Sequence, residues 1–282
     1  MTHFAIAGLQ LELQASDNLT LVLTKIRQTL LRYPWVQMVV LSELAVDGCA
    51  LGKAKAMPSD EERALCDVAR ELGIWLVSGS LYERVEDKVY NTASVINPVG
   101  DVVTRYRKMY PFYPYEKNVE AGDRVCTFEV PDVGTFGLSI CYDMWFPETS
   151  RAMACQGAEV ILHPTLTNTH DRDLELAMNR ATAVQNQCYV IDVNGAGEQA
   201  VGRSLFVGPE GDILHAAGEN EEVMITEVDI SRVRRTRERG VMGLGQPLKS
   251  FRDAGHRYDH QQQDLQDTFL GTLGALELPK LG

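Results

Sequence analysis

Hydrophobic positions along the chain follow two periods, which predict strands and helices in alternation. Short apolar runs such as 36–42 are typical of buried strands, whereas the apolar residues of 19–33 recur at helical spacing. Asn18 and Ser59 stand where two helices would begin, and both are residue types that cap helices. We expect helices at 19–33, 59–72, 147–156 and 171–186, and strands at 4–11, 36–42, 74–82, 159–163 and 189–193.

Between these segments the pattern changes to strands joined by tight turns. Residues 90–96 and 102–106 flank the turn 97–100, and residues 204–207 and 213–216 flank the turn 208–211. Further strands are expected at 126–130, 134–140 and 223–228. This mixture predicts an α/β fold of mixed sheets covered by helices.

Apolar content falls near the carboxyl end of the chain. We expect one domain over 1–254 and, from 255 to 282, a poorly packed tail or an arm for a partner subunit.

Composition narrows the possible functions. The chain has 282 residues, of which 45% are hydrophobic and 23% charged, as in an ordinary globular protein. Its net charge of −12 disfavours nucleic-acid binding, and the basic run 232–239 lacks the interleaved aromatic residues that stack on bases. That run is expected to be a solvated helix or an interface.

The cysteines and the apolar runs bear on location and on metals. The six cysteines are scattered, and no pair has the spacing of metal ligands. No apolar run approaches the length of a membrane span, and the first residues lack the pattern of a secretory leader. We therefore expect a cytoplasmic protein with reduced thiols, no membrane partner and no metal site.

Three residues with reactive or charged side chains follow apolar strands: Glu43, Lys108 and Cys141. Strand ends at one edge of a sheet would bring them together. A cysteine beside a lysine and a carboxylate forms a workable hydrolase set, because the ammonium lowers the thiol pKa and the carboxylate can move the proton. Each residue alone also has an ordinary structural explanation, as a buried small hydrophobe or a surface charge.

Five segments in order resemble the carbon–nitrogen hydrolase family, also called the nitrilase superfamily, over nearly the whole chain. They are Leu41-Ser-Glu43-Leu, Tyr90-Asn-Thr-Ala, Arg105-Tyr-Arg-Lys108, Ile140-Cys141-Tyr-Asp with Phe146-Pro-Glu148, and Asn179-Arg-Ala-Thr-Ala-Val-Gln-Asn186. The resemblance implies a four-layer α-β-β-α sandwich of two mixed sheets. It also implies amide hydrolysis without a metal or an organic cofactor, and a homodimer or higher homo-oligomer with contacts through 147–156 and the tail.

The resemblance also implies roles for individual residues. Glu43 matches the general base, Lys108 the cation that stabilises the tetrahedral intermediate, and Cys141 the nucleophile. The family has a second glutamate after the lysine, for which Glu116 is the candidate and Glu120 the alternative. Lys108 and the backbone N–H of Tyr142 would form the oxyanion hole.

Two positions after the cysteine bear on the substrate. Nitrilases usually carry Trp where this chain has Tyr142, which favours an amide over a nitrile. The ω-amidases typically carry Arg at the position of Trp145, so the chain lacks that carboxylate fork and a neutral small linear amide in an apolar pocket is favoured. The alternatives are an ω-amidase or an N-carbamoyl-amide hydrolase with a carboxylate-bearing substrate, and then a nitrilase.

The pocket walls are predicted from the aromatic residues near the cysteine. Trp145, Tyr113 and Tyr115 are candidates, and the loop 164–173 is expected to border the pocket. Arg172 in that loop could still reach a substrate carboxylate. The acyl group, the subunit number and the pathway are left open by the sequence.

Overall fold

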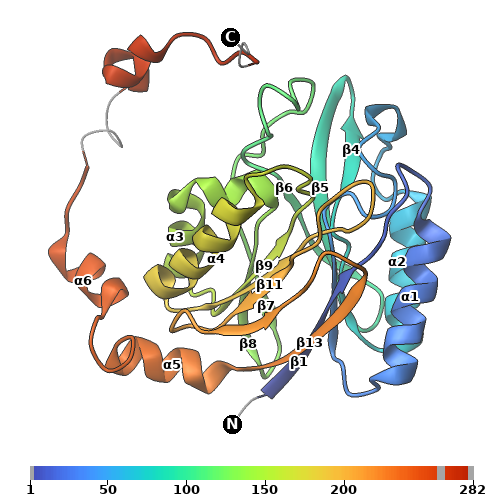
Figure 1. Ribbon diagram of the computed structural model, residues 1–282, viewed down its shortest axis with the longest axis horizontal. Helices are drawn as coiled ribbons and strands as arrows, with labels where there is room; N and C mark the ends of the chain where they lie inside the picture. The colour runs from blue at the N-terminus through green and yellow to red at the C-terminus, as the bar shows by residue number, and fades with distance from the viewer. Residues whose placement is uncertain (1–2, 259–263, 279–282) are drawn as a thin grey trace.

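The computed structural model describes residues 3–258 and 264–278, and its two β-sheets lie face to face with helices on their outer faces (Figure 1). The first sheet has the order β13-β1-β2-β3-β5-β4, with β6 paired to β5, and the second has the order β12-β11-β10-β9-β8-β7. Both sheets are mixed, because β1, β2 and β3 run parallel while β3 and β5 are antiparallel, and β8, β9 and β10 run parallel while β10 and β11 are antiparallel.

The strands lie close to their expected positions. Those of the first sheet are β1 (His3–Gln10), β2 (Met38–Leu41), β3 (Trp75–Val77), β4 (Leu81–Val85), β5 (Lys88–Ile96), β6 (Val102–Arg107) and β13 (Glu222–Asp229). Those of the second are β7 (Cys126–Val130), β8 (Gly134–Leu138), β9 (Val160–Pro164), β10 (Tyr189–Val193), β11 (Leu205–Val207) and β12 (Ile213–Ala216).

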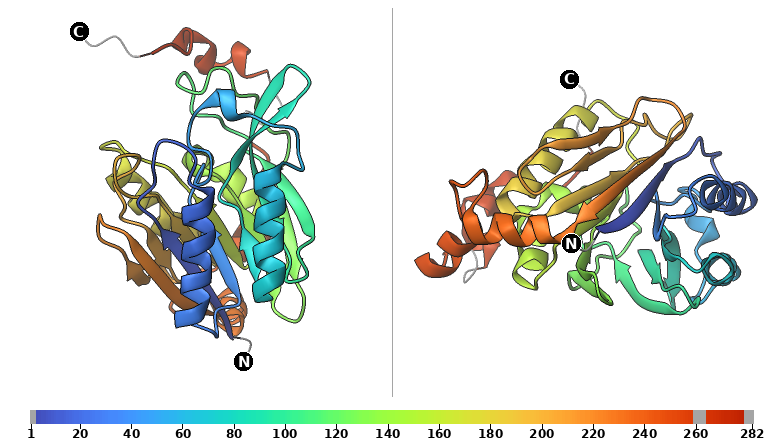
Figure 2. Two further views of the ribbon diagram at one scale, coloured as in Figure 1. Left: turned by 90° about the vertical axis from the view of Figure 1, so that its right-hand side faces the viewer. Right: turned by 90° about the horizontal axis from the view of Figure 1, so that it is seen from below.

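Helices cover both outer faces, as the two further views make plain (Figure 2). The helices α1 (Leu19–Arg32) and α2 (Asp60–Leu72) lie on the first sheet, and α3 (Pro147–Cys155) and α4 (Arg172–Asn186) lie on the second. Each outer face has its own apolar cluster, and the largest cluster, which includes Phe4 and Phe136, fills the space between the sheets. The predicted four-layer α-β-β-α sandwich is confirmed.

The strand expected at 74–82 is wrong as a single element. It divides into β3 and β4, and the intervening Gly79 has φ +71°. A Cβ atom on Gly79 would come within 1.8 Å of the carbonyl oxygen of Ser42, so only glycine permits this close approach. The bend lets Ser80 Oγ accept a hydrogen bond from the Leu44 N–H at 3.0 Å, which supports the loop that follows β2.

The two predicted helix caps differ in outcome. Ser59 caps α2 by accepting from the Glu62 N–H at 3.2 Å, as expected. Asn18 does not cap α1 with its side chain, because its amide exchanges two hydrogen bonds with the backbone of Gln14 instead. The Asn18 side chain therefore stabilises the turn before α1 and does not cap the helix.

The basic run forms α5 (Ile230–Arg239), whose arginines bind groups of the same chain. Arg232 pairs with Asp212 and Glu210, Arg234 pairs with Glu159, and Arg237 donates to backbone carbonyls. The guanidinium groups thus attach the helix to the second sheet.

The last part of the chain leaves the sandwich (Figure 1). After α6 (Pro247–Ala254) the described residues 264–278 form two short 3-10 helices, Leu265–Asp267 and Phe269–Leu273, with exposed apolar side chains. Residues 259–263 and 279–282 of the predicted tail lie outside the described residues. Nowhere in residues 3–258 and 264–278 is there a helix with the length and apolar character needed to cross a membrane.

Candidate active site

The loops that follow β2 and β6 bring three charged groups together. Lys108 Nζ lies 2.9 Å from Glu43 Oε1 and 2.8 Å from Glu116 Oε2, and only 1% of the lysine side chain is exposed. Glu120, the alternative second glutamate, lies at the surface with its carboxylate 4.0 Å from Lys88 Nζ. Of the two candidates, the structure places Glu116 beside the lysine.

Uncharged groups hold these carboxylates in place. The Asn91 side chain in β5 donates to Glu43 Oε1 at 2.8 Å and to Glu116 Oε1 at 3.4 Å. The backbone carbonyl of Asn91 accepts from the backbone N–H of Lys108 at 2.8 Å. The Phe112 N–H donates to Glu116 Oε2 at 2.6 Å. Each charged group of the cluster is therefore held by at least one neighbour, as a buried charged cluster requires, whereas Asn91 Oδ1 is buried with no hydrogen-bond partner among the described residues.

Cys141 lies just beyond β8, in a backbone conformation that few non-glycine residues adopt. Its φ is +47°, and it begins a 3-10 helix, Cys141–Trp145, that leads into α3. The buried carboxylate of Asp143 accepts from the Ile140 N–H at 2.8 Å, the Tyr110 N–H at 2.9 Å and the Tyr106 hydroxyl at 2.7 Å. These bonds hold the strained turn that presents the thiol.

The electrostatics indicate that the thiol rests protonated. Burial raises the pKa of the Cys141 thiol, the Glu43 carboxylate raises it further, and Lys108 lowers it only in part. Lys108 lowers the thiol pKa as expected, but desolvation outweighs the ion, so the net pKa is raised.

The carboxylate nearest the thiol is tuned toward accepting a proton. Burial raises the pKa of Glu43 above its usual value, and Lys108 offsets this only partly. Burial also acts on Glu116, but the ion pair with Lys108 outweighs it and the pKa of Glu116 lies below its usual value. The two glutamates therefore differ, since Glu43 is the better base and Glu116 is a permanent anion.

A cavity of about 560 Å³ opens at Cys141. Trp145 and Tyr115 line it as predicted, and Tyr142, which was predicted to contribute its backbone N–H, lines it as well. Tyr113 does not line it, because its hydroxyl donates to the Val119 carbonyl at 2.7 Å, and Phe112 takes the expected place. The loop 164–173 borders the cavity as expected, and although it contributes polar side chains the exposed lining is mainly apolar, as expected.

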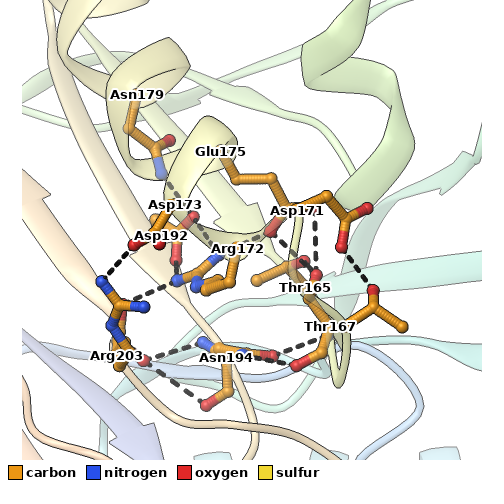
Figure 3. Close-up of polar contacts among 12 residues, drawn as sticks. Thr165, Thr167, Asp171, Arg172, Asp173, Glu175, Asn179, Asp192, Asn194 and Arg203 are labelled. Carbon is orange, nitrogen blue, oxygen red and sulfur yellow. Dashed lines mark hydrogen bonds and ion pairs between the residues drawn. The ribbon is translucent and has the colours of Figure 1, made fainter.

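Arg172 is not available to a substrate carboxylate. Its guanidinium is buried between Glu175 and Asp192, and it donates to the Arg203 carbonyl at 2.9 Å (Figure 3). Asn179 donates to the same Asp192 carboxylate at 2.6 Å. The arginine is therefore bound by this buried network.

Several residues of the site had no role assigned from the sequence. Asn91 and Asp143 fall inside the matching segments, so their position next to Lys108 and Cys141 was a usable signal. Thr165 follows β9 directly, and its hydroxyl hydrogen bonds to the Cys141 thiol, which lowers the pKa of the thiol slightly. Glu175 lies on α4, where no strand end or turn marked it.

The described residues contain no cluster of three or more His, Cys, Asp or Glu side chains that could hold a metal ion. His163 is buried, and its Nδ1 lies 2.8 Å from Ser139 Oγ.

The model of one protein family, described as carbon-nitrogen hydrolase, matches residues 4–238. The chain belongs to the carbon–nitrogen hydrolase family. It is an amidase-type enzyme of the nitrilase superfamily by this match and by its relatives.

This carbon–nitrogen hydrolase is similar to an omega-amidase, a nitrilase and an amidase. It is 30% identical to the omega-amidase NIT2 of Homo sapiens, over 84% of this chain and 93% of that protein. It is 34% identical to a nitrilase of Pyrococcus abyssi, over 71% of this chain and 80% of that one. It is 25% identical to the amidase of Nesterenkonia sp. AN1, with a TM-score of 0.74 over 84% of this chain and 97% of that one. In that structure, a Glu-to-Gln mutant, acrylamide has added to the active-site cysteine.

Proposed function

We propose that this protein hydrolyses a small linear amide to the carboxylic acid and ammonia through a thioester on Cys141. The observation that carries the proposal is the buried Lys108 ammonium bound between Glu43 and Glu116, at a cavity that Cys141 also lines. The set contains a nucleophile, a base and a fixed cation, which acyl transfer needs. The active-site cysteine of the Nesterenkonia amidase supports the same assignment.

The proposed reaction has two stages. Glu43 takes the proton from the Cys141 thiol as the sulfur attacks the amide carbonyl, and the same proton then goes to the departing ammonia. Glu43 next removes a proton from water as the water attacks the thioester, and it returns this proton to the departing Cys141 sulfur when the acid is released. Lys108 and the Tyr142 N–H, one of the first N–H groups of the 3-10 helix and so outside its internal hydrogen bonding, stabilise the oxyanion in both stages.

Glu116 has a positioning role in this proposal. Its carboxylate, whose pKa is lowered by Lys108, stays ionised throughout and keeps the ammonium pointed at the reacting carbonyl. Glu43 is then free to exchange its proton without losing the lysine.

Amides are preferred over nitriles because Tyr142 follows the nucleophile. Among the described residues that line the two cavities at Cys141, Lys108 is the only lysine or arginine, which disfavours the alternative of a carboxylate-bearing ω-amide or carbamoyl amide. That alternative draws its support from the omega-amidase among the relatives.

The decisive experiment replaces the nucleophile. Cys141→Ala and Cys141→Ser should fold and release no ammonia, and hydroxylamine added to the wild-type enzyme during turnover should yield the hydroxamate of the acyl group. Cys155→Ser, a change at an exposed cysteine in α3, is the control and should keep full activity. A folded Cys141→Ala enzyme that still releases ammonia would refute the proposal.

We also propose that the enzyme acts in the cytoplasm and as a homo-oligomer. Its six cysteines are all free thiols, which suits a reducing compartment. The tail carries exposed apolar side chains, including Phe269 at 76% exposure, which suits an arm for a second copy. Cell fractionation tests the first point, and a monomer by light scattering at micromolar concentration would contradict the second.

A further inference from the structure

The cavity at Cys141 has two kinds of lining. One part is a continuous aromatic surface, since the ring centroids of Phe112 lie 4.8 Å from those of both Tyr115 and Tyr142, and Tyr142 lies 5.8 Å from Trp145. The other part comes from the β9–α4 loop and the first turn of α4, and it ends in two acids, Asp171 and Glu175. Aromatic faces together with carboxylates are the surroundings that proteins offer to organic cations.

The charges that line the site are mostly negative. A second cavity shares Cys141, Phe112 and Tyr115 with the first and is also lined by Glu43, Glu116 and Lys108. Together the described lining residues include four carboxylates and one ammonium. This imbalance favours a cationic ligand over an anionic one, because the field of several like charges adds up within a concave surface.

The buried network behind the cavity maintains this charge. Arg172 is one cation shared by two carboxylates, with its Nη1 2.9 Å from Glu175 Oε2 and 3.2 Å from Asp192 Oδ2 (Figure 3). The single charge of the arginine therefore cannot neutralise both carboxylates. Burial raises the pKa of Glu175, and Arg172 offsets this only in part.

The Glu175 carboxylate also has an acceptor position that its neighbours in the protein do not use. Thr167 Oγ1 lies 3.0 Å from its Oε1 and 2.8 Å from its Oε2, and Arg172 binds Oε2. Each carboxylate oxygen can accept two hydrogen bonds, so Oε1 keeps an acceptor position in addition to the contact with threonine. The arginine and the threonine fix the orientation of this oxygen in advance, which lowers the entropic cost of binding.

We propose that the preferred substrate is a linear amide whose acyl chain ends in a protonated amine, which Glu175 and Asp171 bind next to the aromatic surface. This inference rests on the proposed amidase function and specifies its substrate class. The carbonyl of such a substrate would lie at Cys141 and Lys108, while the ammonium group would reach the first turn of α4.

The test compares three amides with five carbons each. Ammonia release from 5-aminopentanamide, pentanamide and 4-carbamoylbutanoate presents the enzyme with a cationic, a neutral and an anionic end. We expect kcat/KM to be about tenfold to a hundredfold higher for the amine than for pentanamide, and lower again for the carboxylate. The neighbouring homologues with one carbon more or less extend each series.

Variants assign the preference to the two acids. Glu175→Gln and Asp171→Asn should each reduce the ratio of kcat/KM for the amine to that for pentanamide by about threefold or more. Asp171→Asn also covers the case in which Glu175→Gln fails to fold after Arg172 loses a partner. Asp173→Asn is the matched control, because Asp173 is exposed, pairs with Arg203 and does not line the cavity, and its ratio should not change.

The outcomes separate this inference from the proposed function. Ammonia release that depends on Cys141 but is fastest with pentanamide or with the carboxylate overturns the amine preference alone. An amine preference that survives both Glu175→Gln and Asp171→Asn overturns the assigned binding site. No ammonia from any amide in the three series overturns the proposed function, and the inference with it.

Discussion

Replacing Glu116 by glutamine tests the claim that this carboxylate holds the catalytic lysine. Four donors surround it: Lys108 Nζ at 2.8 Å and the Phe112 N–H at 2.6 Å reach Oε2, while Asn91 Nδ2 at 3.4 Å and the Tyr82 hydroxyl at 3.5 Å reach Oε1. Glutamine has the same shape but no charge, and its NH2 group must face some of these donors. The best arrangement keeps the amide oxygen at the Oε2 position and gives up the ion pair.

The expected loss follows from the strength of the charged hydrogen bond. A hydrogen bond to a charged group contributes about 1.5–3 kcal/mol. Every 1.36 kcal/mol corresponds to a factor of ten in rate, so kcat/KM should fall by about 10- to 150-fold. The fall should lie mainly in kcat, because the lysine acts on the developing oxyanion rather than on the bound amide.

The assay is steady-state ammonia release, with thermal unfolding to confirm that the variant is folded. Glu120→Gln is the matched control in the same loop. Its carboxylate is half exposed and lies 4.0 Å from Lys88 Nζ, so kcat/KM should stay within about twofold of wild type. Full activity in Glu116→Gln together with a large loss in Glu120→Gln would refute the assignment of the second glutamate.

Three further predictions concern the support of the site. Asp143→Asn leaves at least one of the three donors to this carboxylate poorly paired, so we expect stability to fall by about 1.5–3 kcal/mol and kcat at least tenfold; wild-type kcat would contradict its positioning role. Phe136→Ala opens a cavity between the sheets beside Phe4 and Phe128, and urea unfolding should show a loss of about 3–5 kcal/mol; a loss under about 1 kcal/mol would mean that the core is not packed as described. Burial lowers the pKa of His163 from 6.5 to about 4. As the pH falls below 6.5, the histidine therefore gains a proton in the unfolded chain but stays neutral in the folded chain down to about pH 4. Wild type should therefore lose about 2 kcal/mol more stability than His163→Gln between pH 8 and pH 5, and equal losses would show that the histidine titrates normally.

Periodicity predicted most of the fold because buried strands and amphipathic helices leave regular patterns. It failed between Ile74 and Tyr82, where Ser78-Gly79-Ser80 interrupts the apolar residues and the chain bends at Gly79, which lies against the Ser42 carbonyl. That contact is with a residue more than thirty positions away, and no local signal records it. The predicted Asn18 cap is absent for a local reason, because the side-chain amide of Asn18 hydrogen bonds to the backbone of Gln14 in the preceding turn instead of to the first N–H groups of the helix.

For the site, the charged residues at strand ends could be predicted and their electrostatics could not. Glu43 and Lys108 follow β2 and β6 of the first sheet, but Cys141 follows β8 of the second, so the expectation of a single sheet edge is wrong and the packing of the two sheets brings the three residues together. The pKa shifts depend on burial, which a sequence does not give. The sequence also does not show which of the two adjacent residues, Phe112 or Tyr113, faces the cavity.

The pairing of β1 with β13 has a consequence for how the chain is made. His3–Gln10 pairs with Glu222–Asp229 over eight residues, so β1 leaves the ribosome more than two hundred residues before its antiparallel neighbour. Until then one edge of β1 has no strand to bond with, and such edges pair with other chains. A nascent or truncated chain that ends before β13 should therefore depend on chaperones to stay free of aggregates, although its catalytic residues are already present.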